Sequence, residues 1–369
     1  MVHDEFGSLV SEICAHTLLA QERPFSWTII ANPTAGGFTI RSRWRKHYAM
    51  LSECVKRARK NPLHEKSGPS PAVPEGSVTG LVLTRDRGHA GDITGALLDE
   101  AASMAKNAEK ERPFNLIITA GGDGTSLEVL TRLYHAPEEA RRDFAVLRLP
   151  MGTGNDGSDS WYLDKALDLL IESAEVKRQR ALRLTTASGK GPFLAFNILS
   201  VGADAFVTHM TNKTKGKMPG DSYKIWVDIA SLFYDRLYKV GMMDVRSMDG
   251  QGREVKSFRE KLLLLAVGES GRRTYGSHNW ILPDDRNVCA LRQMSVFRKI
   301  ALKTLLKHGT HINTPEAMLW DAQAVEFSSQ YPILAQMDGE TVLLKGADFP
   351  AKIELSPPVI PVLKSAPRA

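Results

Sequence analysis

Three glycine-containing segments each follow a short apolar run of the kind that forms a β-strand. Their sequences are Asn32-Pro33-Thr34-Ala35-Gly36, Gly121-Gly122-Asp123-Gly124-Thr125 and Gly152-Thr153-Gly154-Asn155-Asp156. In a parallel α/β sheet, the segments that follow the strands lie at one edge, and ligands bind there. Glycine lets backbone N–H groups approach an anion closely, and a helix starting after each loop would point its positive N-terminal end at the same place. The pattern therefore predicts a phosphate-binding site built from three loops.

Acidic side chains inside two of these loops indicate a metal ion. Asp123 and Asp156 would repel a phosphate directly, whereas Mg²⁺, or a water bound to Mg²⁺, would separate the like charges. Thr125 and Thr153 can cap the following helices or bind a phosphate oxygen. Any one loop alone is commonly a simple strand-to-helix turn, and the sequence lacks both the P-loop pattern with its lysine and a Gly-x-Gly-x-x-Gly fingerprint. The three loops together favour a Mg-nucleotide site for phosphoryl transfer.

Alternating strands and helices are predicted over the first half of the chain. The predicted strands are 27–31, 78–83, 114–120 and 144–149, and the predicted helices are 40–59, 89–107, 125–135 and 162–174. Continuous apolar strands are typical of a parallel sheet that helices cover on both faces. Beyond about residue 175, the sequence predicts strands at 182–186, 193–201, 262–267, 288–292, 324–328 and 342–344, with helices near 222–238 and 296–307.

The predicted elements alternate between strand and helix before about residue 175 and are mostly strands after it, which indicates two domains. We predict an α/β nucleotide-binding domain with a parallel sheet over residues 1–170 and a mostly antiparallel, β-rich domain for a lipid substrate over residues 171–369. The final strand or tail is allowed to pack back on the first domain. Residues 61–77, rich in Pro, Gly and Ser, are predicted to form a surface loop whose role the sequence leaves open.

Composition excludes several classes of protein. The 369 residues are 43% hydrophobic and carry a net charge of +6, which is ordinary for a globular chain and permits an anionic partner. Three widely spaced cysteines fit a reducing compartment better than a disulfide scaffold. Spread-out basic charge argues against nucleic acid as a partner. The sequence shows neither an export signal nor an apolar run of the roughly 20 residues that a membrane span needs.

Taken together, the motifs resemble those of the diacylglycerol kinase catalytic family, which includes bacterial lipid kinases and the sphingosine and ceramide kinases. The resemblance runs from about Trp27 to about Leu355. Its motifs are the three glycine loops, Glu128, Asn197, Gly202 and Asp204, the segment Gly271–Gly276 with Pro283-Asp284-Asp285, and Asp338-Gly339-Glu340. A Gly-Gly-Asp-Gly loop alone also occurs in NAD kinases and phosphofructokinases, whereas its combination with Gly-Thr-x-Asn-Asp and a late Asp-Gly-Glu is specific to the lipid-kinase branch.

The resemblance implies a role for each matching residue. ATP would lie between the domains, Asp123 and Asp156 would organise Mg²⁺ through water, and Glu340 would accept the proton of a lipid hydroxyl, with Asp123 as the alternative base. Asp284 and Asp285 would contribute to a structural metal site. The nucleotide-binding residues implied in this way are Asn32, Pro33, Thr34, Gly36, Thr84, Gly121, Gly122, Gly124, Thr125, Glu128, Gly152, Thr153 and Asn155.

This chain departs from the family pattern at several positions. Leu127 stands where the family has Asn, Gly157-Ser158-Asp159 replaces Phe-Ala-Arg, and Ser277-His278 replaces a glycine pair. Arg286 and Cys289 stand where the family has a Gly and an Asp, which puts the structural metal site in question. The Asp338-Gly339 dipeptide is also a strong hairpin-turn signal on its own.

We therefore expect an ATP- and Mg²⁺-dependent lipid kinase, a phosphotransferase acting on the hydroxyl of diacylglycerol or a sphingoid-like lipid. The alternatives are a soluble, NAD kinase-like enzyme and a catalytically degenerate protein that binds lipid or nucleotide. The expected protein is cytoplasmic and binds a membrane transiently. The basic helix 41–60 is a candidate for that contact, or else simply covers the sheet, and the aromatic stretch 223–234 could line an acyl-chain cleft or be plain core. The acceptor lipid and the oligomeric state, a homodimer included, are left open.

Overall fold

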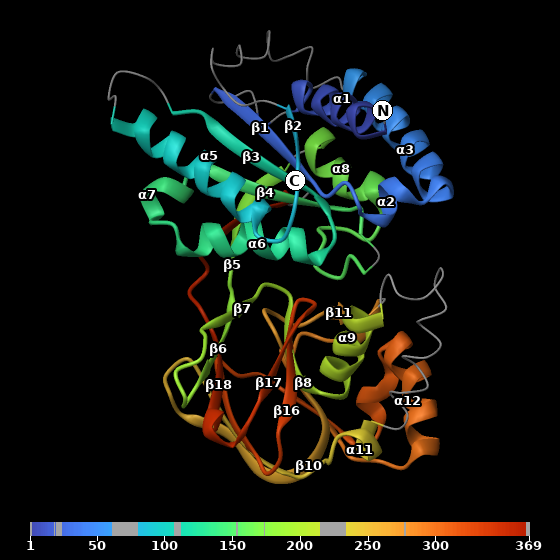
Figure 1. Cartoon of the computed structure of the whole chain (residues 1–369), viewed down its shortest axis with the longest axis vertical. Helices are drawn as coiled ribbons and strands as arrows, with labels where there is room; N and C mark the ends of the chain where they lie inside the picture. Colours follow the sequence, from blue (N-terminus) through green and yellow to red (C-terminus); the bar gives the residue numbers. More distant parts are fainter. Residues whose placement is uncertain are drawn as a thin grey trace. The chain divides into compact units, whose positions relative to one another are not determined.

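The chain forms two compact units, which Figure 1 shows in a computed structural model. The first unit comprises Met1–Gln179 together with Pro358–Ala369, and the second comprises Arg180–Pro357. The structure describes residues 2–17, 19, 24–60, 80–106, 112–152, 154–172, 174–214, 234–276 and 278–366.

A mostly parallel sheet forms the centre of the first unit, with strand order β2-β1-β3-β4-β19-β5. Its strands are β1 (Phe25–Ala31), β2 (Gly80–Leu83), β3 (Phe114–Gly121), β4 (Phe144–Pro150), β5 (Ala174–Gln179) and β19 (Ile360–Ser365). Neighbouring strands in this order run parallel, except that β5 is antiparallel to β19. Every residue of β1 and β4 is buried, which explains why their sequences are mostly apolar on both faces, with Ser26, Thr28 and Arg148 as the buried polar exceptions.

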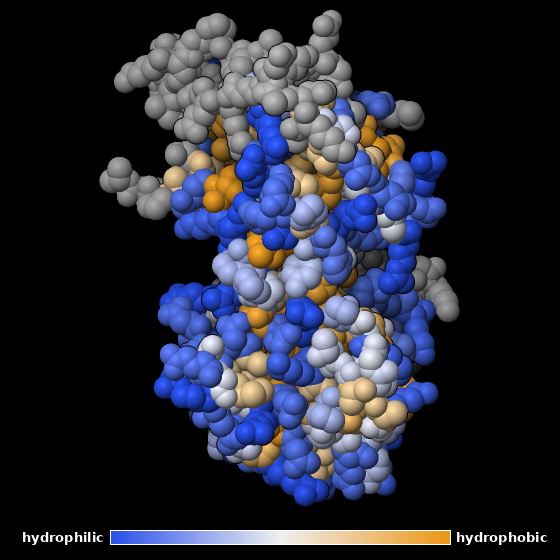
Figure 2. Space-filling model, turned by 90° about the vertical axis from the view of Figure 1, so that its left-hand side faces the viewer, coloured by the Kyte–Doolittle hydropathy of each residue, from blue (hydrophilic) through white to orange (hydrophobic). Residues whose placement is uncertain are grey.

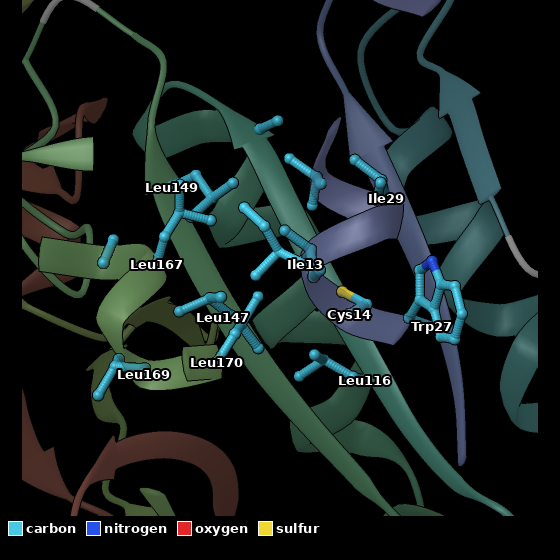
Figure 3. Packing of buried hydrophobic residues seen from close by; sticks show 14 of the residues in the cluster. Ile13, Cys14, Trp27, Ile29, Leu116, Leu147, Leu149, Leu167, Leu169 and Leu170 are labelled. Carbon is cyan, nitrogen blue, oxygen red and sulfur yellow. The ribbon is translucent and has the colours of Figure 1, made fainter. Parts of the chain in front are cut away.

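Helices cover both faces of this sheet (Figure 1). They are α1 (Val2–Ala15), α2 (Gly36–Thr39), α3 (Arg41–Arg59), α5 (His89–Lys106), α6 (Asp123–His135), α7 (Glu138–Arg141) and α8 (Leu163–Ile171). Figure 3 shows one face, where Cys14 of α1 and Leu170 of α8 pack over Leu116 and Leu147 of the strands. Burial of each large apolar side chain stabilises the fold by about 1.5–3 kcal/mol.

Helix α3 contributes to the same core, since Leu51, Cys54, Val55 and Ala58 are buried along one side of it. The basic segment 41–60 therefore covers the sheet with its apolar side, as one of the two interpretations of the sequence expected. Helix α1 was not predicted, although Phe6, the first of its buried residues, begins a helical repeat of apolar positions.

One helix boundary and one strand of the first unit differ from the sequence prediction. The helix expected over 162–174 ends at Ile171, and the chain then enters β5. Strand β5 is polar and half exposed, and its partner β19 lies at the far end of the sequence. Local periodicity could not reveal this pairing because β5 has no apolar repeat of its own.

The second unit is an antiparallel β structure. Its main sheet has the order β17-β16-β8-β10-β9-β15-β18-β6-β7, with β13 and β14 attached beside β10, and β11 pairs with β12. Its strands are β6 (Leu182–Thr186), β7 (Phe193–Ala195), β8 (Ile198–Gly202), β9 (Met242–Met248), β10 (Glu254–Gly268), β11 (Arg273–Tyr275), β12 (Asn279–Leu282), β13 (Val288–Arg292), β14 (Ala317–Trp320), β15 (Ala324–Ser329), β16 (Ile333–Met337), β17 (Glu340–Leu344) and β18 (Ala351–Leu355). Its helices are α9 (Ala203–Thr214), α11 (Tyr234–Leu237) and α12 (Val296–His308), with short 3-10 turns at Thr310–Asn313 and Gly346–Asp348. The predicted fold class, a mostly parallel α/β sheet followed by an antiparallel β sheet, is confirmed.

Several elements of the second unit differ from their predictions. The strand expected over 193–201 is interrupted at Phe196 and Asn197, and the run 262–267 is only the buried end of the longer β10. The first half of β10 alternates exposed with partly buried residues and carries charged side chains at both kinds of position, so it lacks an apolar run. Of the helix expected near 222–238, residues 222–233 lie outside the described part, as do the 61–77 loop and most of the aromatic stretch 223–234.

The surface shown in Figure 2 is mostly hydrophilic, with scattered apolar patches. Within the residues that the structure describes, no helix is both long enough and apolar enough to cross a bilayer.

Candidate active site

The three glycine loops lie together at the carboxyl ends of β1, β3 and β4. The Asn32 N–H donates to the Ala120 carbonyl at 3.0 Å, and the Gly37 N–H donates to the Met151 carbonyl at 2.8 Å. A Cβ added to Gly152 would lie 2.5 Å from the Gly122 Cα. Glycine is therefore required at 152 because the second and third loops touch through their backbones.

The first loop is shaped by the Asn32 side chain. Its Oδ1 accepts hydrogen bonds from the Thr34 N–H at 3.0 Å and from the Thr34 hydroxyl at 2.8 Å. The Ala35 N–H donates to the Asn32 carbonyl, and Gly36 begins the short helix α2 after Pro33 and this turn. An asparagine that bonds backbone two residues ahead closes a tight turn. The asparagine thus fixes the loop that the sequence assigned to the nucleotide.

The third loop is folded by Asn155, which adopts a left-handed backbone conformation with φ of 59°. Its Oδ1 accepts the Gly152 N–H at 2.7 Å, and its Nδ2 donates to the carbonyls of Gly152 and Pro150 at 3.1 and 3.3 Å. Asparagine tolerates this conformation better than most residues. The side chain of Asn155 therefore acts within its own loop. Thr153, predicted to bind nucleotide, lies outside the described residues.

Two carboxylates approach the same point on the third loop. A Cβ added to Gly154 would lie 3.0 Å from Oδ2 of Asp123 and 3.5 Å from Oδ2 of Asp156. The Gly157 N–H donates to Oδ1 of Asp123 at 2.9 Å, which orients that carboxylate. A Cβ added to Gly157 would lie only 3.3 Å from the same oxygen, so glycine at this position leaves room for the Asp123 carboxylate.

These donors fit a Mg²⁺ ion held through water. Mg²⁺ keeps several waters and is bound through one or two carboxylates plus substrate phosphates in many phosphoryl-transfer sites. Asp123 and Asp156 supply two carboxylates, and no group of three or more His, Cys, Asp or Glu that could enclose a metal occurs among the described residues. A site completed by phosphate and water therefore suits this edge of the sheet.

Of the three loops, only the second leads directly into a long helix. Helix α6 begins at Asp123 with Gly122 as its N-cap, and the N–H groups of Thr125 and Ser126 both bond the Gly122 carbonyl. After the third loop, α8 begins only at Leu163. The prediction of a helix N-terminus directly after each loop is therefore wrong for the third loop, because residues 157–162 form an intervening segment.

A buried ion pair holds that intervening segment against β4. Asp159 accepts from the Arg148 guanidinium at 2.7 Å and from Lys364 of β19 at 3.0 Å, and its side chain is fully buried. Burial by itself would raise the pKa of Asp159, but the charges of Arg148 and Lys364 lower it from 3.8 to about 2. Sequence analysis noted Asp159 only as a departure, since its partners lie on distant strands.

Two further predicted nucleotide-binding residues lie beside the loops. The Thr84 N–H donates to the Ala31 carbonyl at 2.9 Å, which fixes Thr84 at the end of β2. Glu128 accepts the N–H groups of Gly88 and Ala90 at 2.8 and 3.1 Å. The carboxylate of Glu128 therefore caps the start of α5 and ties α6 to the segment after β2. A nucleotide contact for either residue stays a prediction.

In the second unit, the Asp-Gly-Glu motif forms a tight hairpin turn. Asp338 and Gly339 have positive φ values of 44° and 99°, and Met337 of β16 pairs with Glu340 of β17. The buried Asp338 carboxylate accepts the N–H groups of Phe196, Asn197 and Ile198, the last at 3.0 Å. This explains the interruption between β7 and β8, since those amides bond a side chain instead of a neighbouring strand.

Helix α9 supports the same turn. Asn212 Nδ2 donates to the Gly339 carbonyl at 2.7 Å, and His209 Nδ1 lies 3.2 Å from the Thr341 hydroxyl. Burial lowers the pKa of His209, with a further contribution from Lys213. Glu340, between these two contacts, is thereby placed on a rigid turn. Sequence reasoning missed α9 and both residues, and its placement of Glu340 near the glycine loops stays a prediction.

A half-buried acid lies at the start of α9. Asp204 accepts the Ser200 hydroxyl and the Ala205 N–H, and Gln336 donates to the same Ser200 oxygen at 2.8 Å. Burial raises the pKa of Asp204 from 3.8 to about 6, against the opposing effect of these hydrogen bonds. A network of this kind fixes β8, β16 and α9 relative to one another.

The predicted structural metal site does not fit its residues. The Arg286 guanidinium bonds the Asp284 carboxylate, and Arg272 Nε lies 2.6 Å from Oδ1 of Asp285. The hydrogen bond from Arg286 lowers the pKa of Asp284 below its usual range. Cys289, at the position of a family Asp, is fully buried. Guanidinium groups therefore neutralise the two carboxylates that a cation would need.

Comparisons with known proteins agree with this geometry. The model of the diacylglycerol kinase catalytic domain matches residues 26–187. A "Diacylglycerol kinase" of Staphylococcus carnosus is 25% identical over 65% of this chain and 74% of its own length, and a "Probable lipid kinase YegS-like" of Yersinia enterocolitica is 27% identical over 71% and 80%. The "Crystal structure of a putative diacylglycerol kinase from Bacillus anthracis str. Sterne" superposes with a TM-score of 0.56 over 91% of this chain and 94% of that one, at 16% identity. This last similarity concerns the fold.

Proposed function

Because residues 26–187 belong to the diacylglycerol kinase catalytic domain family, we propose that this protein transfers the γ-phosphoryl group of ATP to the hydroxyl of a lipid, diacylglycerol or a sphingoid-like lipid. The observation that carries the proposal is the convergence of Asp123 and Asp156 on Gly154, between glycine loops whose backbones touch. Catalysis of phosphoryl transfer consists mainly of positioning and electrostatic stabilisation, and such an edge can supply both.

In this proposal, different residues of the chain bind phosphate, hold the metal ion and accept the proton. Backbone N–H groups of the glycine loops and the N-terminus of α6 bind phosphate oxygens, since glycine leaves them accessible. Asp123 and Asp156 would hold Mg²⁺ through water, and the bound ion would supply positive charge beside the transferred group. Glu340 accepts the proton of the lipid hydroxyl, with Asp123 as the alternative base.

Gly124 offers a clean test of the phosphate-binding role. A Cβ added there has no atom within 4 Å, whereas Gly lowers helix stability relative to Ala by roughly 0.5–1 kcal/mol. We expect Gly124→Ala to keep or raise the melting temperature and to weaken ATP binding by at least about tenfold, because the methyl group meets the nucleotide. Unchanged ATP affinity, measured by calorimetry, would show that phosphate does not approach α6 at this residue.

A lipid panel with radiolabelled ATP and Mg²⁺ tests the reaction itself. Label in an organic-soluble product supports the lipid kinase, and label in NADP after addition of NAD identifies an NAD kinase-like enzyme. ATP binding without any labelled product identifies a protein that binds but does not transfer. In the same assay, Glu340→Gln is expected to lower kcat far more than it changes the KM for ATP. The reverse pattern would assign Glu340 to nucleotide binding.

A further inference from the structure

An apolar stripe on α12 is unusually exposed for a folded unit. Phe297 is 84% exposed and Ile300 is 53% exposed, and Ala301 and Thr304 continue the same side of the helix. The opposite side bears Leu302, which is buried in the core of the second unit. Helix α12 is therefore already anchored, and its apolar stripe is additional to the surface that folding requires.

The charged side chains of α12 itself are all basic. Helix α12 carries Arg298, Lys299, Lys303, Lys307 and His308, and it contains no acidic residue. Lys299 is buried in an ion pair with Asp235 at 2.8 Å, and Arg298 pairs with Glu316 on the flank. Lys303 and Lys307, one turn apart, lie beside the exposed stripe and are themselves exposed.

Helix α11 packs beside α12 and helps to anchor it. The Asp235–Lys299 ion pair joins the two helices at 2.8 Å, and Gln293, just before α12, donates a hydrogen bond to Asp235. Figure 1 shows the two helices as neighbours. The contact involves the buried Lys299, so it leaves the exposed stripe of α12 uncovered.

We propose that this surface, Phe297 and Ile300 with Lys303 and Lys307, docks the second unit on an anionic lipid bilayer. An amphipathic helix with an apolar stripe and basic flanks binds the interface by burying the stripe while its cations attract anionic headgroups. A second copy of this chain is disfavoured as the occupant, because like charges on α12 would face each other. The inference rests on the proposed lipid substrate, which has to be taken from a membrane.

Vesicle binding without ATP tests this surface separately from catalysis. The probe is sedimentation with vesicles of phosphatidylcholine alone or of equal parts phosphatidylcholine and phosphatidylglycerol. We expect the protein to prefer the anionic vesicles and to lose affinity as salt screens the charges. Phe297→Gln with Ile300→Gln should lower the partition coefficient at least about tenfold, since neither glutamine gains from leaving water for the bilayer interface as the apolar side chains do.

Val255→Gln is the matched control, because Val255 is a 47% exposed apolar residue on β10 of the same unit. This variant should bind vesicles like the unchanged protein. Exposed glutamines are good helix formers, so the double variant should keep its melting temperature. Equal vesicle binding by the double variant and the control, or no binding by the unchanged protein, would overturn the docking surface. Kinase activity on lipid dispersed in detergent tests the proposed function separately, because that assay does not need the protein to dock on a bilayer.

Discussion

Replacement of Asp338 separates the structural part of the Asp-Gly-Glu motif from its proposed chemistry. The carboxylate of Asp338 bonds three backbone N–H groups, those of Phe196, Asn197 and Ile198, and all three residues are buried. Leaving a buried donor without a partner costs about 1–3 kcal/mol. Asp338→Ala also places alanine at a φ of 44°, which costs about 1–2 kcal/mol.

These costs predict that Asp338→Ala lowers the free energy of unfolding by about 4–6 kcal/mol, if water takes over part of the hydrogen bonding to the three N–H groups. Asp338→Asn keeps one acceptor oxygen and a residue that tolerates positive φ, so it should lower the free energy of unfolding by only about 1–2 kcal/mol. Hydrogen exchange read by mass spectrometry on the 193–202 segment measures the effect directly. Protection should fall strongly in the alanine variant and mildly in the asparagine variant, and kcat should fall with it because Glu340 follows the turn. Equal protection in all three proteins would refute the role of Asp338 as the anchor of these amides.

Three other changes test the framework of the two units. Lowering the pH should destabilise the first unit through Asp159, because its pKa of about 2 in the folded protein lies below the ordinary value of 3.8. The ionised Asp159 contributes about 2 kcal/mol to the free energy of unfolding; this contribution is complete above pH 4 and is lost toward pH 2. Asp159→Asn should therefore flatten that part of an acid-unfolding curve. The pH dependence that Asp204 gives has the opposite direction, because its pKa in the folded protein is raised to about 6. Its contribution to the free energy of unfolding is complete below pH 3.8 and is lost as the pH rises through 6. Asp204→Asn should therefore raise the melting temperature at pH 7, and a lower value there would contradict the assignment. Gly152→Ala should lower the melting temperature markedly because its Cβ meets the Gly122 backbone at 2.5 Å, while Gly124→Ala serves as the control that meets nothing.

The sequence predicted the glycine loops well because their signal is local. Glycine, asparagine and aspartate at short spacing identify segments that leave the ends of apolar strands, and the structure brings those segments together. The direction in which each side chain points could not be read in the same way. Asn155 bonds its own loop and Glu128 caps α5, although an asparagine or a glutamate at either position could equally have faced a ligand.

Long-range partners account for most of what the sequence did not reveal. The break between β7 and β8 depends on Asp338, more than a hundred residues away along the chain. Asp159 takes its counterions from β4 and from β19 near the end of the chain. Strands such as β9 carry exposed charges at alternate positions, so they lack the continuous apolar run used to find the others.

The departures from the family pattern have physical partners of their own. Gly157 donates its N–H to Asp123, and Asp159 locks the following segment to Arg148. Arg286 provides a positive charge for Asp284 where a family metal site would provide a cation. Because Asp159 and Arg286 form ion pairs that stabilise the same local structure, these departures change how the site is held. The carboxylates of Asp123 and Asp156 still meet at Gly154, so these departures are weak evidence for a degenerate enzyme.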